Sequence, residues 1–458
     1  MVNPVGNARP LAMCVGMGVA LLLSSVSMTR QNRALWRSWQ TLAQHPMRRG
    51  IATARAEGAM ERYRPRFLSC QAQLEQAGRE QLSKKSITVV QFNILARNLA
   101  TRNHFPYVIE TSLNWENRKM TLLRQLEALD ADIVCLEELS DYWTFFKPEL
   151  SERGYDSVFV KRPSLNVSNW SGEKKHDGCG IFYKKNKFEL KECESVNFHD
   201  AHDRVAILAL LKLRDFSQFV LVGCTHLWWN AKKVEHQMAE LFELEEEVIR
   251  MSSDVKDKYE RDLEGTVTGR GNLPIILCGD FNNSPDSAIY EYLHRSFMQE
   301  PNIEGVSERF RSAYAKYKYN RRQYRLANPT ANDDEEEEEE EGSEEQDSNS
   351  IEAQHGEPPH TTVNFRRCWT IDYIWYSSST IVPRQVLEIP SERILRSEEG
   401  PPDWFNRLAM SDSYSKLGRL PSGLHGNHNG IPNSQFGSDH VPIMAEFEFL
   451  KSRSEDKH

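Results

Sequence analysis

The sequence lacks the cysteine patterns that build zinc centres and disulfide frameworks. Only eight of the 458 residues are cysteine. They are scattered, with no CxxC pair and no Cys/His cluster at the spacing of a zinc site. Cys135, Cys179, Cys224 and Cys278 each fall inside an apolar run typical of a buried strand. We therefore expect buried, reduced thiols and a reducing compartment.

Charge of one sign is missing from two segments. Residues 1–56 hold seven Arg and no Asp, Glu or Lys, whereas residues 329–357 hold fourteen Asp and Glu and no Lys or Arg. The net charge of −9 is thus an average over unlike segments, and about −2 remains without them. The rest of the chain is near neutral, so its net charge indicates neither an acidic nor a basic partner.

The first 56 residues are typical of a targeting or anchoring segment. Residues 11–28 form an apolar run that is barely long enough to span a bilayer. The Arg-rich, acid-free stretch after it is amphipathic, as in a mitochondrial transit peptide. If the apolar run is a membrane anchor instead, the Arg residues that follow it would keep the body in the cytosol. A secretory signal is disfavoured by the scarcity of positive charge before the run.

From residue 87 onward, apolar runs that predict strands are interspersed with helical patterns. Strands are expected at residues 87–94, 132–139, 180–183, 205–213, 219–227, 275–281, 369–376 and 441–449, and helices at 115–129, 233–250 and 287–293. Asn114 is the expected N-cap of the first helix, and Met120 and Leu122 are expected on its apolar face. Two adjacent strand pairs favour an α/β sandwich over a simple alternating fold. Residues 57–86 are expected to be a polar lead-in, and 451–458 a polar tail.

Residues 333–341 are nine consecutive acidic residues. Such a run repels itself and cannot build a core, so we expect it to be disordered. It lies between two segments of the candidate site, which makes 329–357 an insertion and not a domain boundary. Either it is a solvated insertion, or it competes with a polyanionic substrate.

Polar residues stand at the ends of the expected strands, where ligands and reacting groups gather in sheet proteins. They are Asn93, Glu138, His226, Asp280, Asn282, Asp372, Asp439 and His440. Each alone has a structural explanation, such as a turn or a hydrogen-bonded core residue. Together they are carboxylates, amides and imidazoles, with no nucleophilic Cys and no Ser in a GxSxG turn. This set suits Mg²⁺ or Mn²⁺ and the hydrolysis of a phosphate ester.

The motifs QFNILA, LEEL, DGCGIFYK, THLWWN, GDFN, TIDYIW and SDH follow one another between about Ile87 and Phe449. In this order they resemble the endonuclease/exonuclease/phosphatase superfamily, and within it the branch of carbon-catabolite-repressor deadenylases, Angel proteins and nocturnin. The resemblance implies a DNase I-like, four-layered α/β/β/α sandwich. It also implies a site at one end of the paired sheets, and hydrolysis without a covalent intermediate.

The resemblance further implies a role for each residue of the set. Three oxygen donors would hold Mg²⁺: Glu138, Asn93 and Asp439. Five residues would act on the water and the phosphate: Asp280 on the water, Asn282 and His226 at the phosphate, and His440, oriented by Asp372, at the transition state.

The chain departs from the family pattern at two positions. Glu137 stands where the family often has Gln, and it would either raise metal affinity or point into solvent. Arg204 stands where many deadenylases have Asn, and it would contact phosphate or act as a structural cation. Leucine-rich repeats are missing upstream, so the adaptor-binding arrangement of the large deadenylase complex is not supported.

Three functions stay open. The favoured one is a poly(A)-specific, deadenylase-like 3′→5′ exoribonuclease that acts on single-stranded 3′ ends. Aromatic and polar residues near the site would then contact bases, unless they pack against the core: Trp228, Trp229, Asn230, Phe365 and Trp369. The second is a nocturnin-like phosphatase that removes the 2′-phosphate of NADP(H), although in that relative basic residues follow Thr-His-Leu. The third, a catalytically weak RNA-binding scaffold, is weakened by the intact motifs.

Overall fold

The computed structural model describes residues 65–78, 82–163, 176–199, 203–215, 218–259, 262, 273–298, 310–328, 356–365, 367–396 and 430–451. The expected N-terminal segment and acidic run lie outside these residues. Among the described residues, no helix combines the length and the apolar character needed to cross a membrane.

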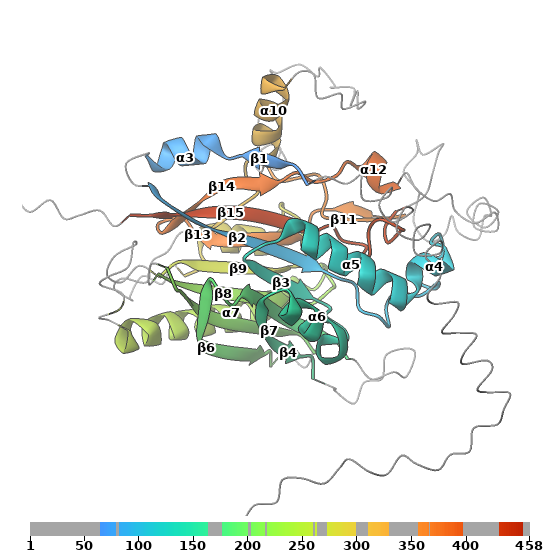
Figure 1. The fold of residues 1–458 in the computed structure, drawn as a ribbon, viewed down its shortest axis with the longest axis horizontal. Coiled ribbons are helices and arrows are strands. Elements are labelled where there is room, and N and C mark those ends of the chain that lie inside the picture. Colours follow the sequence, from blue (N-terminus) through green and yellow to red (C-terminus); the bar gives the residue numbers. More distant parts are fainter. Residues whose placement is uncertain are drawn as a thin grey trace, which may run out of the picture. The chain divides into compact units, whose positions relative to one another are not determined.

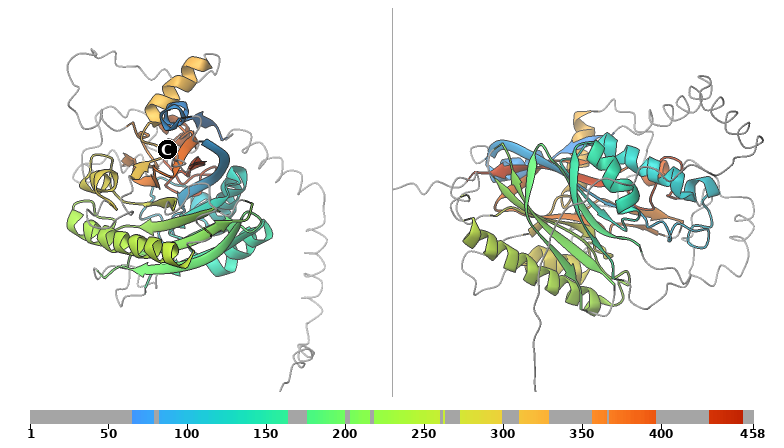
Figure 2. Two further views of the ribbon diagram at one scale, coloured as in Figure 1. Left: turned by 90° about the vertical axis from the view of Figure 1, so that its left-hand side faces the viewer. Right: turned by 60° about the horizontal axis from the view of Figure 1, so that its bottom comes forward.

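Two large sheets lie face to face (Figures 1 and 2). The larger has the order β1 (Phe67–Ser69), β14 (Ile381–Leu387), β15 (Ile443–Leu450), β2 (Leu82–Asn93), β3 (Ile133–Glu137), β5 (Gly178–Lys184) and β4 (Tyr155–Lys161). The smaller has the order β10 (Phe310–Ser312), β13 (Asp372–Ser377), β9 (Ile275–Asp280), β8 (Phe219–His226), β7 (Val205–Leu213) and β6 (Phe188–Asn197). A separate hairpin joins β11 (Thr362–Asn364) to β12 (Arg367–Trp369).

Helices cover the outer face of each sheet. On the larger sheet, α5 (Trp115–Leu129) and α6 (Lys147–Glu152) pack against apolar residues of β2 and β3. On the smaller sheet, α7 (Val234–Lys258) and α9 (Ala288–Arg295) pack against β7, β8 and β9. The remaining helices are α3 (Gln71–Ala77), α4 (Glu110–Leu113), η2 (Tyr142–Phe146), α10 (Tyr317–Ala327) and α12 (Glu392–Arg396). The expected α/β/β/α order of layers is confirmed.

The alternation of side chains along β2 divides apolar from polar residues. Val90 and Phe92 belong to the core beneath α5. Gln91 and Asn93 point the other way and bond to residues of the smaller sheet, Asp372 and Asp280. Because successive side chains of a strand face opposite sides, the same strand supplies both the core and the site.

The expected helix at residues 115–129 has those bounds, and Asn114 caps it by accepting a hydrogen bond from the Glu116 amide. Met120 is exposed, so its expected place on the buried face was wrong. Arg118 is buried there instead, because its guanidinium donates to the carbonyls of Ile94, Leu95 and Gly437. A buried cation thus ties α5 to the loops that carry Asn93 and His440.

Other boundaries differ from the prediction. The strand expected at residues 369–376 is divided, because the Thr361 hydroxyl accepts hydrogen bonds from the amides of Ile371 and Asp372. The expected lead-in is partly sheet: β1 pairs with β14, and β2 begins at Leu82. Strands β4, β6 and β14 were not predicted. The four cysteines expected in buried strands are buried and free.

Candidate active site

Three strands of the smaller sheet bring site residues together at one end. Asp280 is the last residue of β9 and pairs in register with His226 of the parallel strand β8. On the other side it pairs with Asp372, the first residue of the antiparallel strand β13. The sheet ladder therefore fixes these three residues side by side. His440 comes from the loop before β15 and forms an isolated bridge with Thr362.

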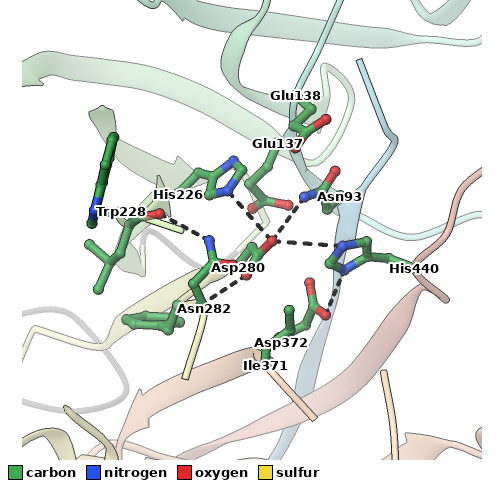
Figure 3. A network of polar contacts seen from close by, with 12 residues as sticks. Asn93, Glu137, Glu138, His226, Trp228, Asp280, Asn282, Ile371, Asp372 and His440 are labelled. Atoms are coloured by element: carbon green, nitrogen blue, oxygen red, sulfur yellow. Dashed lines mark hydrogen bonds and ion pairs between the residues drawn. The ribbon is translucent and has the colours of Figure 1, made fainter. Parts of the chain in front are cut away.

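The Asp280 carboxylate is the centre of this arrangement (Figure 3). Its Oδ2 lies 2.9 Å from Asn93 Nδ2, 3.6 Å from His226 Nε2 and 3.8 Å from His440 Nε2. Its Oδ1 accepts from the Asn282 backbone amide at 2.9 Å. Burial and the negative charge of Asp372 raise the pKa of Asp280 to about 7, against the effect of these donors. The geometry suits a carboxylate that orients a water molecule and takes its proton.

Asp372 orients His440. Its Oδ2 accepts from His440 Nδ1 at 2.9 Å and also from the Thr361 hydroxyl. Burial lowers the pKa of His440, but the charge and hydrogen bond of Asp372 outweigh it, so the pKa lies well above its ordinary value. With Nδ1 held by Asp372, the Nε2 of the imidazole faces Asp280 and can donate a proton or a hydrogen bond.

Sequence reasoning missed two residues that hold Asp372 in place. Gln91 Nε2 donates to Asp372 Oδ1 at 2.9 Å, and Thr361 donates to the other oxygen. Gln91 precedes Asn93 by two positions, so it lies on the same face of the strand, and this spacing was a usable signal. Thr361 gave no comparable signal, since its contact depends on the hairpin that follows it.

Glu137 does not point into solvent. It is fully buried, and it accepts hydrogen bonds from Gln91 Nε2 and from the Cys224 thiol. Burial, together with the charge of Asp372, raises the pKa of Glu137 well above its usual range. Its neighbour Glu138 has a positive φ of 53° and turns the other way. The two adjacent carboxyls, of Glu137 and Glu138, therefore lie in different environments.

Of the three expected metal ligands, Glu138 and Asp439 are partly exposed and Asn93 is buried. Glu138 Oε2 accepts from the Ala96 amide, and Asn93 Oδ1 accepts from the Leu95 amide, which leaves further lone pairs on both groups. Burial and the charges of Asp177 and Asp439 raise the pKa of Glu138. Carboxylates crowded together with an amide oxygen are the donors that a hard divalent cation needs, so the residues fit Mg²⁺ or Mn²⁺.

A second set of ligand atoms, from Asp280, Asp372 and His440, lies within 4.8 Å of one another. In this set the Asp372 oxygens are engaged by Gln91, Thr361 and His440. We therefore interpret it as a hydrogen-bonded triad, and the Glu138 side as the metal side.

Asn282 is held in place as well. Its φ is 52°, its backbone amide donates to Asp280, and its side-chain Nδ2 donates to the Leu227 carbonyl at 3.0 Å. The left-handed backbone at this position is tolerated by Asn better than by most residues. One of the two Nδ2 hydrogens is thus used within the protein, and an amide nitrogen has a second that can be donated.

Arg204 is buried beside the site. Its guanidinium lies over the Trp228 ring, with Cζ 5.9 Å from the ring centroid. Among the described residues, its Nε and Nη1 atoms find no hydrogen-bond partner. Burial and the charge of Arg162 lower its pKa, whereas the charges of Asp203 and Glu138 act against this. A buried guanidinium so poorly satisfied is costly to stability.

The other candidate contact residues differ in what they offer. Trp229 is 57% exposed, whereas Trp228 is half-buried and its backbone bonds to α7. Asn230 accepts from the Lys232 amide and so stabilises its own turn. Phe365 packs against Tyr107, with ring centroids 5.2 Å apart. Of these four residues, Trp229 presents the most free surface.

The sequence matches a known family and several curated proteins. The profile of the Endonuclease/Exonuclease/phosphatase family matches residues 90–440. The CCR4-Not complex 3'-5'-exoribonuclease subunit Ccr4 of Saccharomyces cerevisiae is 25% identical over 405 residues, which are 82% of this chain and 40% of that protein. Protein angel homolog 2 of Danio rerio is 26% identical over 400 residues, 79% of this chain and 64% of that protein. The chain thus spans less than two thirds of the length of either relative.

A solved structure shares the fold. The crystal structure of ANGEL2, described as a 2',3'-cyclic phosphatase in complex with adenosine-2',3'-vanadate, superposes with a TM-score of 0.55 at 21% identity. The match covers 84% of this chain and 99% of that one. The expected DNase I-like architecture is therefore confirmed. The chain belongs to the endonuclease/exonuclease/phosphatase family, in the branch that includes the Ccr4 and Angel proteins.

Proposed function

We propose that this protein is a Mg²⁺-dependent phosphodiesterase that removes nucleotides from the 3′ end of single-stranded RNA. The observation that carries the proposal is the convergence of Asn93, His226 and His440 on one oxygen of Asp280. Two imidazoles and an amide around a buried carboxylate suit the attack of water on a phosphate better than they suit a structural role.

In the proposed reaction, Asp280 takes a proton from water as the water oxygen attacks the terminal phosphodiester. The bond between phosphorus and the 3′ oxygen of the preceding nucleotide breaks. A nucleoside 5′-monophosphate leaves, and the 3′ oxygen takes a proton from solvent. His226 and His440 donate N–H groups to the phosphoryl oxygens, where negative charge grows. When held by Glu138, Asn93 and Asp439, Mg²⁺ supplies positive charge that neutralises the phosphate.

RNA is favoured by the surroundings of the site and by the relatives. The exposed Trp229 offers a flat surface on which a base can stack. Ccr4 relatives carry the name 3'-5'-exoribonuclease. The ANGEL2 title names a 2',3'-cyclic phosphatase, so an RNA end with a cyclic phosphate is a second candidate substrate. NADP is the third candidate substrate, because the sequence motifs resemble those of nocturnin.

The decisive experiment offers the purified full chain five substrates with Mg²⁺: poly(A), mixed-sequence RNA, DNA, NADP and RNA that ends in a 2',3'-cyclic phosphate. We expect RNA to shorten from its 3′ end with release of 5′-monophosphates. Release of inorganic phosphate from NADP, or opening of the cyclic phosphate without shortening, would replace the proposed substrate. If none of the five is turned over, the protein is not this enzyme.

The metal side is tested with Glu138→Ala. This change should abolish turnover and weaken Mg²⁺ or Mn²⁺ binding in calorimetry, while the melting temperature stays near that of the wild type. Glu152→Ala is the matched control, because Glu152 is exposed on α6. Full turnover by the Glu138 variant in Mg²⁺ would show that the metal site lies elsewhere.

A further inference from the structure

A line of buried polar side chains continues from His440 into the space between the two sheets. Gln91 donates from its Nε2 atom both to Asp372 Oδ1 and to Glu137 Oε2, each at 2.9 Å. Asp372 accepts from His440 Nδ1, and Glu137 accepts from the Cys224 thiol at 3.2 Å. Each of these five side chains is more than 90% buried. The line runs from the site to Glu137, the first carboxyl of the LEEL motif.

The strand register explains why Glu137 faces inward. In the parallel pair of β2 and β3, Asn93 stands opposite Glu137. The side chain of Glu137 therefore points to the smaller sheet, as Asn93 does. Strand β3 ends at Glu137, and Glu138, with its positive φ, turns its own carboxyl away from that of Glu137 (Figure 3). Glu137 thus reaches the site only through its hydrogen-bond partner.

The carboxyls of Glu137 and Asp372 together determine the orientation of the Gln91 amide. Its Oε1 has no hydrogen-bond partner among the described residues, so its nitrogen alone determines how the amide lies. Carboxyl oxygens of Glu137 and Asp372 flank that nitrogen on two sides. Turning the amide over would break both of these hydrogen bonds and place the amide oxygen against Asp372 Oδ1, which is unfavourable in a buried, low-dielectric position.

We propose that Glu137 is a positioning residue: through Gln91 it fixes the Asp372 carboxylate, and through Asp372 the imidazole of His440. The consequence for turnover rests on the proposed function, whereas the consequence for the His440 hydrogen bond does not. Glu137 is then neither a metal ligand nor a solvent-facing carboxylate, although its neighbour Glu138 lies on the metal side.

Two substitutions separate positioning from simple burial. Glu137→Gln keeps an oxygen that accepts from Gln91, and Glu137→Leu removes it at similar volume. We expect E137L to lower kcat about tenfold or more with KM nearly unchanged, and E137Q to stay within about threefold of the wild type. Equal losses in both variants, or a loss confined to KM, would contradict the inference.

A double-mutant cycle with His440→Ala shows whether Glu137 acts through the imidazole. Without that imidazole nothing is left to position, so E137L should lower kcat no further in the H440A background. If E137L lowers kcat by the same factor in both backgrounds, the role is merely structural and the inference is wrong.

The hydrogen bond itself can be followed without substrate or metal. The His440 Nδ1–H proton resonance should appear downfield in the wild type and in E137Q, and move upfield in E137L. An unchanged resonance in E137L overturns the inference, whatever the activity. If E137L does not fold, Gln91→Leu breaks the same line at its centre and should give the same upfield shift. Failure to cleave any substrate would reject the proposed function and leave this measurement valid.

Discussion

At the scale of single residues, two buried arginines near the site have opposite surroundings. Arg162 forms ion pairs with Asp177 at 2.8 Å and Asp203 at 2.7 Å. Arg204 has two guanidinium nitrogens without hydrogen-bond partners among the described residues. The first arrangement stabilises the loops that it joins. The second lacks this compensation, which is expected if the cation serves an anionic substrate.

This contrast predicts different results for two equivalent substitutions. Arg204→Gln should lower turnover about tenfold or more while the melting temperature is unchanged or higher, because a poorly satisfied buried cation is removed. Arg162→Gln should cost about 3 kcal/mol or more in the free energy of unfolding, since it removes the ion pairs that Arg162 forms with two buried carboxylates, Asp177 and Asp203. Thermal melts and initial rates measure both. An Arg204 variant that melts early and keeps its rate would show a structural cation.

His440 is expected to act mainly in the transition state. His440→Ala should lower kcat about a hundredfold or more, with KM little changed, because in the proposed reaction its Nε2 donor stabilises negative charge that grows on the phosphate only in the transition state. His199→Ala is the control, since His199 is 91% exposed and paired with Glu243. The measurement is the steady-state kinetics of H440A. A normal kcat in this variant would show that His440 takes no part in the mechanism.

The burial of Glu357 predicts that the stability of the protein depends on pH, separately from catalysis. Burial raises the pKa of Glu357 from 4.5 to about 7 against the effect of hydrogen bonds from Ser312 and Tyr290, and its Oε2 has no hydrogen-bond partner among the described residues. Because folding favours the protonated form, the folded state loses stability as the pH rises from the unfolded pKa to about 7. The loss is about 3 kcal/mol.

Glu357→Gln should abolish this loss. Its advantage in free energy of unfolding over the wild type should therefore grow between pH 4.5 and 7 and then level off. Denaturant titrations of both proteins across that range provide the comparison. If the free energy of unfolding of the two proteins changes with pH in parallel, Glu357 is not buried in the way that the structure shows.

At the scale of elements, the approach of β8 to β9 places His226 beside Asp280, and Gly279 permits it. A Cβ at position 279 would lie 2.4 Å from the Thr225 carbonyl oxygen. Gly279→Ala should therefore push the strands apart, cost about 1–3 kcal/mol in stability and lower turnover. Gly223→Ala is the matched control, because its Cβ would meet side-chain ends of Leu277 and Leu208, which can move. Equal losses in melting temperature would argue against backbone crowding.

Element boundaries also show where local sequence is insufficient. The helix at 115–129 was predicted to the residue, since its cap and its apolar spacing are local features. The division between β12 and β13 was missed, because it depends on the hydroxyl of Thr361, which comes from before the hairpin. Arg118 was missed for the same reason: the carbonyls that satisfy it belong to distant loops.

At the scale of the whole molecule, the acidic insertion is expected to be separable from the fold. Deleting residues 331–355 should change the melting temperature little, because the closure entropy of a loop grows slowly with its length. If the insertion competes with polyanions, the deletion should raise turnover on RNA more than on a small phosphate ester. A large fall in melting temperature would show that the segment contributes to the fold. Equal changes on both substrates would reject the competition.

The sequence by itself determined which acids, bases and possible metal ligands the candidate site offers. Carboxylates, amides and imidazoles at strand ends, without a covalent nucleophile, indicate metal-assisted attack on phosphate, because side-chain type sets the available acids, bases and ligands. The tertiary structure alone decided the partners. Whether Glu137 faces solvent or Gln91, and whether Arg204 is satisfied, depends on residues far apart in the chain. Such contacts form only when the two sheets pack, and no local pattern records them.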